Sequence, residues 1–128
     1  MKVLFDAIFA RYQATSLFSA LTAMYNTVAD EKAVFPYCVF SLPSDTQDWT
    51  FTEQSEDCLI RFNLFSRTTL ATEVCDLFEL LKAAFDFAEL SITGFQQVSL
   101  VREPGVTLFK IDDVWQYTVV YRIVMQKD

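Results

Sequence analysis

Residues 58–85 read CLIRFNLFSRTTLATEVCDLFELLKAAF, and the hydrophobic period changes in the middle of this stretch. In 58–66 apolar and polar residues alternate, which is typical of a strand with one buried face. From Leu70 onwards the spacing becomes three and four, which predicts one apolar helical face, made of Leu70, Val74, Leu77, Phe78, Leu81 and Phe85. We therefore expect a strand at 58–66 and an amphipathic helix at 70–85, with Thr68 or Thr69 as its N-cap.

The segments before this stretch have weaker patterns. Apolar residues in 2–12 recur at helical spacing, and Thr15 or Ser16 can cap a further turn through Leu21. Residues 23–29 could run extended. The β-branched and aromatic run 37–42 predicts a strand, which we expect to pair as a hairpin with 58–66.

The segments after it predict two more strands. The first is 95–102, followed by a turn at Pro104-Gly105, and the second is the long alternating run 115–125. One face of this last strand is apolar throughout, whereas its opposite face is mixed and should be solvated or meet a partner. Helices and strands in this order predict an α+β fold in a single domain, 1–128. Its mainly antiparallel sheet should have about four to five strands, with the helices packed on one face.

Composition excludes several classes of protein. The net charge of −7 disfavours binding to nucleic acid, because binding requires neutralisation of phosphates. Cys38, Cys58 and Cys75 lack CxxC spacing and lie in apolar runs, as core residues of a reducing cytosol do. Asp6 and Arg11 interrupt the apolar amino terminus, and no run is long enough to span a membrane, so we expect no export signal and a soluble protein.

The sequence offers little catalytic chemistry. It contains no histidine, and its two glycines, Gly94 and Gly105, cannot build a phosphate-binding loop. The acidic candidates for a carboxylate-only or metal-assisted site are Glu53, Glu56, Asp57, Asp112 and Asp113, all of which stand in polar segments before strands. We expect these to be solvated loop charges, and we assign no catalytic residue, metal ligand or cofactor. A carboxylate-dependent hydrolase and a small-molecule carrier with a Phe-lined pocket remain alternatives.

Two polar connections are the candidates for contact with other proteins. Residues 44–57 carry Trp49 and Phe51, which serve either local packing or an interface, where aromatic residues are enriched. Residues 102–113 carry Val106 and Phe109 and begin at Arg102. We expect Trp49→Ala or Phe109→Ala to weaken assembly while the monomer stays folded.

The ordered segments resemble a known family. They are FPYCVFSL at 35–42, LIRFNLFS at 59–66 leading into the acidic helix, ITG at 92–94, EPG at 103–105 and WQYTVVYR at 115–122. This order is similar to that of the tail-completion, or tail-terminator, proteins of long-tailed, siphovirus-like bacteriophages and prophages. The likeness covers nearly the whole chain and departs most in 22–30, where the expected glycine and proline are missing.

The resemblance implies a structural protein of the virion, made in the host bacterial cytoplasm. It would form a homo-oligomeric ring, commonly a hexamer, at the head-proximal end of the tail tube, where it ends tail growth and joins the tail to the head-tail connector or stopper. DNA would pass through the lumen without being held, and an acidic chain suits such a channel because like charges repel. Another neck component, a head-closure or adaptor protein, is the alternative.

Overall fold

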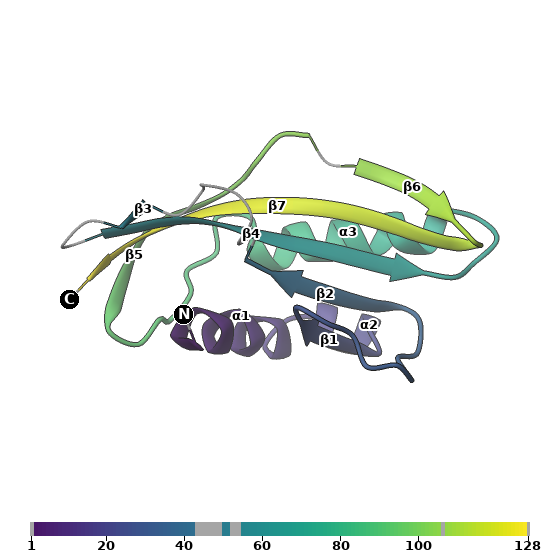
Figure 1. Cartoon of the computed structure of the whole chain (residues 1–128), viewed down its shortest axis with the longest axis horizontal. Helices are drawn as coiled ribbons and strands as arrows, with labels where there is room; N and C mark the ends of the chain where they lie inside the picture. The colour runs from purple at the N-terminus through teal and green to yellow at the C-terminus, as the bar shows by residue number, and fades with distance from the viewer. Residues whose placement is uncertain (1, 43–49, 52–54, 106, 128) are drawn as a thin grey trace.

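The computed structural model describes residues 2–42, 50–51, 55–105 and 107–127 (Figure 1). This part of the chain forms three helices: α1 (Lys2–Gln13), α2 (Leu17–Ala20) and α3 (Thr72–Phe85). It also forms seven strands: β1 (Ala23–Asn26), β2 (Tyr37–Ser41), β3 (Thr50–Phe51), β4 (Ser55–Ser66), β5 (Phe95–Arg102), β6 (Thr107–Ile111) and β7 (Val114–Lys127). The expected helices and strands are therefore confirmed, with β3 and β6 as additions.

The strands form one mixed sheet built around β4 and β7. These two long antiparallel strands pair from Ser55 opposite Gln126 to Ser66 opposite Trp115. The order across the sheet is β1-β2-β4-β7-β5, and β2 pairs with β4 in antiparallel fashion as expected. β3 shares the β2 edge of β4, and β6 shares the β5 edge of β7. Pairing is antiparallel except between β1 and β2, which run parallel.

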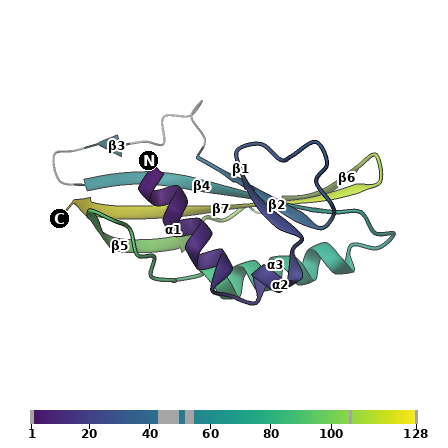
Figure 2. The ribbon, with the colours of Figure 1, turned by 90° about the horizontal axis from the view of Figure 1, so that it is seen from below.

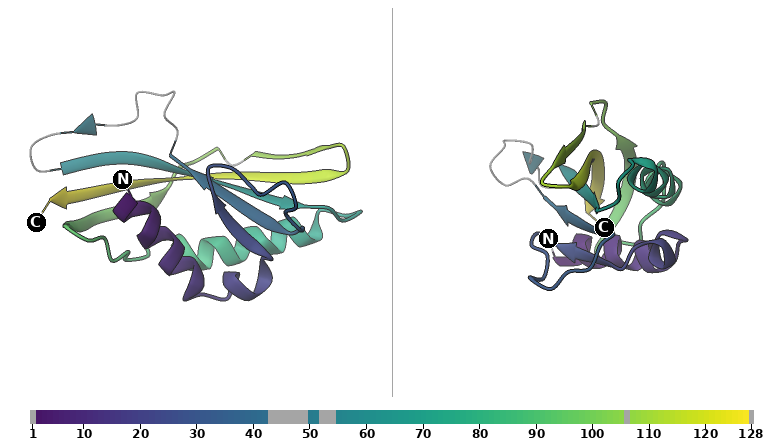
Figure 3. Two further views of the ribbon diagram at one scale, coloured as in Figure 1. Left: turned by 60° about the horizontal axis from the view of Figure 1, so that its bottom comes forward. Right: turned by 90° about the vertical axis from the view of Figure 1, so that its right-hand side faces the viewer.

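All three helices pack on one face of the sheet, as Figures 2 and 3 show. The inward-facing residues of β4 and β7 are fully buried against them, among them Ile60, Phe62, Val119 and Tyr121. The apolar face expected for the last strand is thus the core face of β7. Burial of this single apolar face is the main stabilising contribution, because isolated strands and short helices are marginal in water. The α+β class with helices on one face is confirmed.

The start of α3 differs from the prediction. The helix begins at Thr72, Ala71 occupies the N-cap position without a side-chain hydrogen bond, and Leu70 is 69% exposed. The hydroxyl of Thr68 donates to the carbonyl of Leu70, while the buried hydroxyl of Ser66 donates to Glu73. Thr68 and Thr69 therefore do not cap the helix, and the assignment of Leu70 to the core face was wrong.

The segment 102–113, expected to be a connection, contains the strand β6. A two-residue turn, Asp112-Asp113, joins Ile111 to its partner Val114, and both aspartates have positive φ, 51° and 65°. This is the geometry of a type I′ hairpin turn, in which Asn-Gly or Asp-Gly is the usual sequence. Because Asp-Asp is not a usual sequence for this turn, the turn residues did not predict the hairpin.

The amino-terminal third follows the prediction with two changes. The first helix ends at Gln13, and the expected further turn is α2, although Ser16 at its N-cap makes no side-chain hydrogen bond. The hydroxyl of Thr15 donates backwards to the carbonyl of Tyr12 instead. The extended stretch expected at 23–29 is β1, which ends at Asn26.

Candidate assembly surfaces

For three of the five predicted contact residues, the structure does not describe the side chain. Trp49 and Val106 lie outside the described residues, and Phe51 is described as a backbone position in β3, opposite Glu56. The other two, Arg102 and Phe109, are half-buried and stand on different strands along the same edge of β7.

Phe109 lies in the β6–β7 hairpin. It pairs with Gln116, so its side chain is on the sheet face opposite to the helices. Its neighbours Leu108 and Ile111 are 39% and 60% exposed, and the ammonium of Lys110 stands 5.2 Å from the centre of the Trp115 ring. The hairpin thus presents apolar side chains to solvent at one end of the sheet, which is the composition of a contact surface.

Arg102 belongs to a polar network at the C-terminal end of α3. Its guanidinium is 3.8 Å from Asp86 and 5.5 Å from the centre of the Phe78 ring. The other oxygen of Asp86 accepts a hydrogen bond from the hydroxyl of the buried Tyr121. Burial, the hydrogen bond to Asp86 and the charge of Asp86 raise the pKa of Tyr121 well above its ordinary value. Arg102 therefore also ties β5 to α3 within the chain.

The outer face of the sheet is not covered by any helix of the described chain. Thr118 donates to the side-chain oxygen of Asn63 at 2.7 Å, and the amide of Gln116 donates to the same atom at 3.1 Å. Beside them, Tyr37 stacks on Phe65 with ring centres 5.0 Å apart and meets Tyr25 edge-on. The mixed outer face expected for the last strand is confirmed, and its polar groups satisfy one another across strands.

Of the acidic candidates for catalysis, Asp57 lies far from Asp112 and Asp113 along the sheet. Asp57 is held by Arg122, whose Nε donates to it at 2.9 Å and whose Nη2 makes a second bond. Asp57 stands opposite Val124, whereas Asp112 and Asp113 form the hairpin turn before Val114, about 33 Å away at ~3.3 Å per residue. Glu53 lies outside the described residues, as does the side chain of Glu56. Within the described chain, no group of three or more acidic or cysteine side chains is placed to hold a metal ion.

The carrier alternative places a Phe-lined pocket between the helices and the sheet. There, the rings of Phe62 and Phe85 lie 4.8 Å apart, and Phe62 meets Tyr121 edge-on at 5.8 Å. Phe78 stacks on Tyr117 at 4.3 Å. The aromatic rings in this region therefore pack against one another.

The cysteines have the environment expected of core residues. Cys38 and Cys58 are fully buried, and Cys75 is half-buried against the core, with no disulfide among the three. Burial raises the pKa of the Cys38 thiol well above its ordinary value, so the thiol stays protonated at neutral pH.

A surface groove lies beside the first turns of α3, and we call it the α3 groove. Its volume is about 610 Å³. The lining residues come from α2, the segment before β2, the β4–α3 loop and α3: Ala20, Pro36, Thr68, Thr69, Leu70, Thr72, Glu73, Asp76, Leu77 and Leu80. These residues include two carboxylates and no cation. The exposed Leu70 stands on the groove, in the position where the sequence predicted a core residue.

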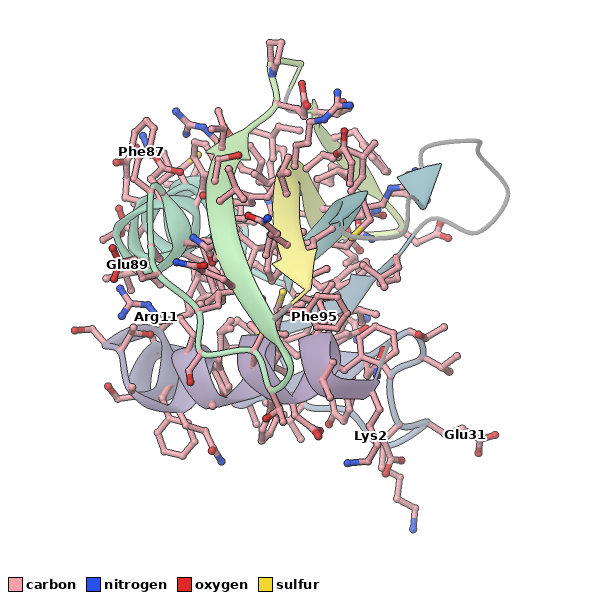
Figure 4. The ribbon with its side chains drawn as sticks, turned by 90° about the vertical axis from the view of Figure 1, so that its left-hand side faces the viewer. Lys2, Arg11, Glu31, Phe87, Glu89 and Phe95 are labelled. Carbon is pink, nitrogen blue, oxygen red and sulfur yellow. The ribbon has the colours of Figure 1, made fainter. Side chains whose placement is uncertain are left out.

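Phe87 is a candidate contact residue that the sequence reading missed. It follows the end of α3 and has a positive φ of 56°. Its side chain is 79% exposed and points away from the body of the molecule (Figure 4). A signal was present, because Phe87 falls between Phe85 and Ala88, both buried, and so lies off the apolar face. A second groove of about 540 Å³ runs from Phe87 along the segment 89–92 and β5.

No helix in the described chain is both long and apolar enough to cross a lipid bilayer.

The fold and its exposed apolar surfaces define an α+β protein whose sheet is covered by helices on one face. No protein-family model and no curated protein matches the sequence. The fold is shared with a chain from the virion of a native gene transfer agent (GTA) particle, at a TM-score of 0.77 and 17% identity over 94% of this chain and 92% of that chain. A second solved structure is similar at a TM-score of 0.53 and 11% identity, over 96% and 94% of the two chains.

Proposed function

We propose that this chain is a structural virion protein that forms a ring, a hexamer, at the head-proximal end of a phage tail tube. There it ends tail growth and joins the tail to the head-tail connector or stopper. The observation that carries the proposal is the likeness to a chain of a GTA virion particle, which extends over nearly the full length of both chains. The sequence resemblance to tail terminators supports the more specific role at the end of the tail.

The exposed surfaces support assembly with other proteins. We propose Trp49, Phe51, Arg102, Val106 and Phe109 as contact residues with neighbouring subunits, the tail tube or the connector. Of these, Phe109 has the best structural support, because its neighbours Leu108 and Ile111 in the hairpin are exposed. Exposed apolar surface of this kind favours association, since burial removes it from water.

The charge of the chain suits a ring through which DNA passes. The net charge of −7 makes retention of the phosphate backbone unfavourable, so DNA can move through the lumen without specific binding. No cofactor or metal takes part in this function, which consists of assembly and not of catalysis.

The test is the assembly state of the purified chain and its position on tails. Native mass spectrometry and negative-stain microscopy should show a closed ring of one size, which binds one end of purified tail tubes. A chain that stays monomeric at all concentrations and never binds tubes contradicts the proposal. A ring that binds the isolated connector but not the tube would instead indicate another neck component, a head-closure or adaptor protein.

A further inference from the structure

The strand β6 is the least protected edge of the sheet. It pairs with β7 on one side, and no strand of the described chain pairs with its other side. In Figure 1 it lies at the upper right, with no other element above it. The edge of a sheet exposes unpaired backbone N–H and C=O groups, and these can pair with a strand of another chain.

The other edges of the described sheet have features that hinder such pairing. β5 has a bulge between Gln97 and Ser99, and β1 and β3 have only four and two residues. Bulges and short strands are common means of protecting an edge. The register of β6 has no bulge, and its five residues, TLFKI, contain neither proline nor glycine and favour a strand.

Lys110, the charged residue of β6, does not block this edge. A lysine that extends across an edge is another common means of protection. Here the ammonium group lies 5.2 Å from the centre of the ring of Trp115, its partner residue in β7. The lysine side chain is therefore directed back over the sheet of its own chain and leaves the edge open.

The hairpin turn determines which backbone groups of β6 face outwards. In a two-residue hairpin the residues on either side of the turn, here Ile111 and Val114, form a hydrogen-bonded pair. Hydrogen-bonded and non-hydrogen-bonded pairs then alternate along the two strands. Phe109 thus bonds to β7, whereas the N–H and C=O groups of Leu108 and Lys110 face away from it.

These outward groups match those of a second copy of β6. In an antiparallel pair with Phe109 of one copy opposite Phe109 of the other, Leu108 of each copy lies opposite Lys110 of the other. All four outward-facing residues then have hydrogen-bonding partners. The two phenylalanines form a non-hydrogen-bonded pair, in which side chains approach most closely. A shift of two residues towards the turn would place the two lysines opposite each other, which is unfavourable.

We propose that β6 pairs with β6 of a second copy in this register, across a two-fold axis between the two Phe109 residues. The contact is isologous, because the same surface serves in both copies. A cyclic ring closes through heterologous contacts, so this contact goes beyond the proposed function and does not depend on it. It concerns the purified chain in the absence of tails, whether its subunits are single or already in rings.

A disulfide cross-link tests the register directly. Phe109→Cys places two thiols at directly opposite positions, with Cα atoms about 4.5 Å apart, a separation that a disulfide spans. Ile111→Cys is the matched control. It lies on the same face and Ile111 is 60% exposed, but the equivalent residue of the second copy is offset by four residues, about 14 Å.

Both variants are made with Cys75→Ser, because Cys75 is half-buried whereas Cys38 and Cys58 are fully buried. After incubation with oxidised glutathione, non-reducing gel electrophoresis should show covalent dimers of Phe109→Cys and no larger species. They should form about tenfold faster than with the control, since only the opposite pair meets the geometry of a disulfide. Equal cross-linking of the two variants, or none, overturns the proposal.

Substitutions of Leu108 test the pairing without a cross-link. Leu108→Glu places a carboxylate opposite Lys110 of the other copy, and Leu108→Lys places an ammonium group there, twice in each dimer. In sedimentation equilibrium, the first should tighten and the second weaken dimerisation by about threefold or more. Val98→Glu and Val98→Lys are the controls, because they change the net charge equally at a position of β5 that is 62% exposed.

The net charge alone predicts the opposite order. With −7 on each chain, an added carboxylate increases the general repulsion between copies and an added lysine reduces it. If Leu108→Lys dimerises more tightly than Leu108→Glu, as the Val98 variants should, the proposed register is overturned. Circular dichroism verifies that each variant is folded.

Failure of this contact and failure of the ring are distinguishable. If the unmodified chain forms rings but Phe109→Cys does not cross-link, the β6 contact is wrong and the ring proposal stands. If the cross-link forms but the unmodified chain never closes into a ring or binds tail tubes, the β6 contact stands and the proposed function fails.

Discussion

At the scale of single residues, the buried hydroxyl of Tyr121 is the clearest polar element of the core. Its side chain is fully buried, and its hydroxyl donates to Asp86, which Arg102 also approaches. A buried polar group is tolerated where a partner satisfies it. This one bond therefore connects β7 to the end of α3 and supports the segment that carries Phe87.

Tyr121→Phe should lower the free energy of unfolding by about 1–2 kcal/mol, because it removes the donor and leaves the half-buried carboxylate of Asp86 with a more distant partner. Urea denaturation monitored by tryptophan fluorescence measures this change. Tyr117→Phe is the control, since the half-buried Tyr117 makes no hydrogen bond through its hydroxyl with the described residues. Equal losses in the two variants would show that the Asp86 bond contributes nothing specific.

The stability of the chain should fall at alkaline pH. The pKa of Tyr121 is raised above its ordinary value of 10.0, so above about pH 10 the unfolded chain loses a proton that the folded chain keeps. The stabilisation is therefore complete below this pH and is lost as pH rises, by at most about 1.4 kcal/mol per pH unit for one group. Between pH 8 and about pH 11, the free energy of unfolding measured with urea should fall less steeply with pH for Tyr121→Phe than for the unmodified chain. Identical slopes would contradict the assignment.

At the scale of elements, local patterns predicted the interiors of helices and strands better than their ends. Alternation of apolar and polar residues predicted β4 and β7, and apolar residues at helical spacing predicted α3. Both patterns arise because the buried face repeats with the period of the element. The true start of α3 depends on Ser66 and on Trp115, whose indole donates to the carbonyl of Thr68 at 3.1 Å from 47 residues away. No local window of sequence contains that contact.

The β6–β7 hairpin gives a prediction at this scale. Asp113→Gly should raise the free energy of unfolding by about 0.5–1 kcal/mol, because glycine adopts a positive φ of 65° without a steric penalty and Asp-Gly suits a type I′ turn. Thermal or urea unfolding tests this. Asp113→Ala removes the same charge but keeps the Cβ atom, so it should not stabilise. If both substitutions stabilise equally, charge repulsion in the turn is the cause and not backbone strain.

At the scale of the whole molecule, a sheet covered on one face leaves its other face and its edges for neighbours. The outer face has hydrogen-bonded polar groups and stacked aromatic rings. Exposed large hydrophobic side chains occur at the hairpin, at Leu70 and at Phe87, and also on α1, α2, the segment between β1 and β2, and β5. Such a molecule can place different surfaces against different partners, as a ring between a tube and a connector requires.

The assembled protein should not retain DNA, even at low salt. With a net charge of −7 per chain, a ring accumulates negative charge, and contacts with phosphates are repulsive. A gel-shift titration with duplex DNA at about 50 mM salt should show no complex, since electrostatic binding would be strongest under this condition. A lysozyme-sized basic protein serves as the positive control. Salt-sensitive binding would show that the lumen holds DNA and would contradict a passive channel.

The candidate contacts were only partly accessible to sequence reasoning. The segment 102–113 was taken as a connection, whereas it contains the strand β6. The contact roles of Trp49, Phe51, Arg102, Val106 and Phe109 stay predictions. Phe87 and Leu70 were missed, because both are hydrophobic residues beside an amphipathic helix, where burial is the usual outcome. Their exposure depends on where the helix begins and ends.

The sequence by itself determined the α+β class, the single buried face of the sheet and the acidic charge, since these follow from composition and from periods that local geometry imposes. The tertiary structure alone decided the parallel pairing of β1 with β2, the first residue of α3, the β6 strand and the groove beside α3. Each of these depends on contacts between residues that are distant in the chain, and the free energy of such contacts leaves no periodic trace in the sequence around them.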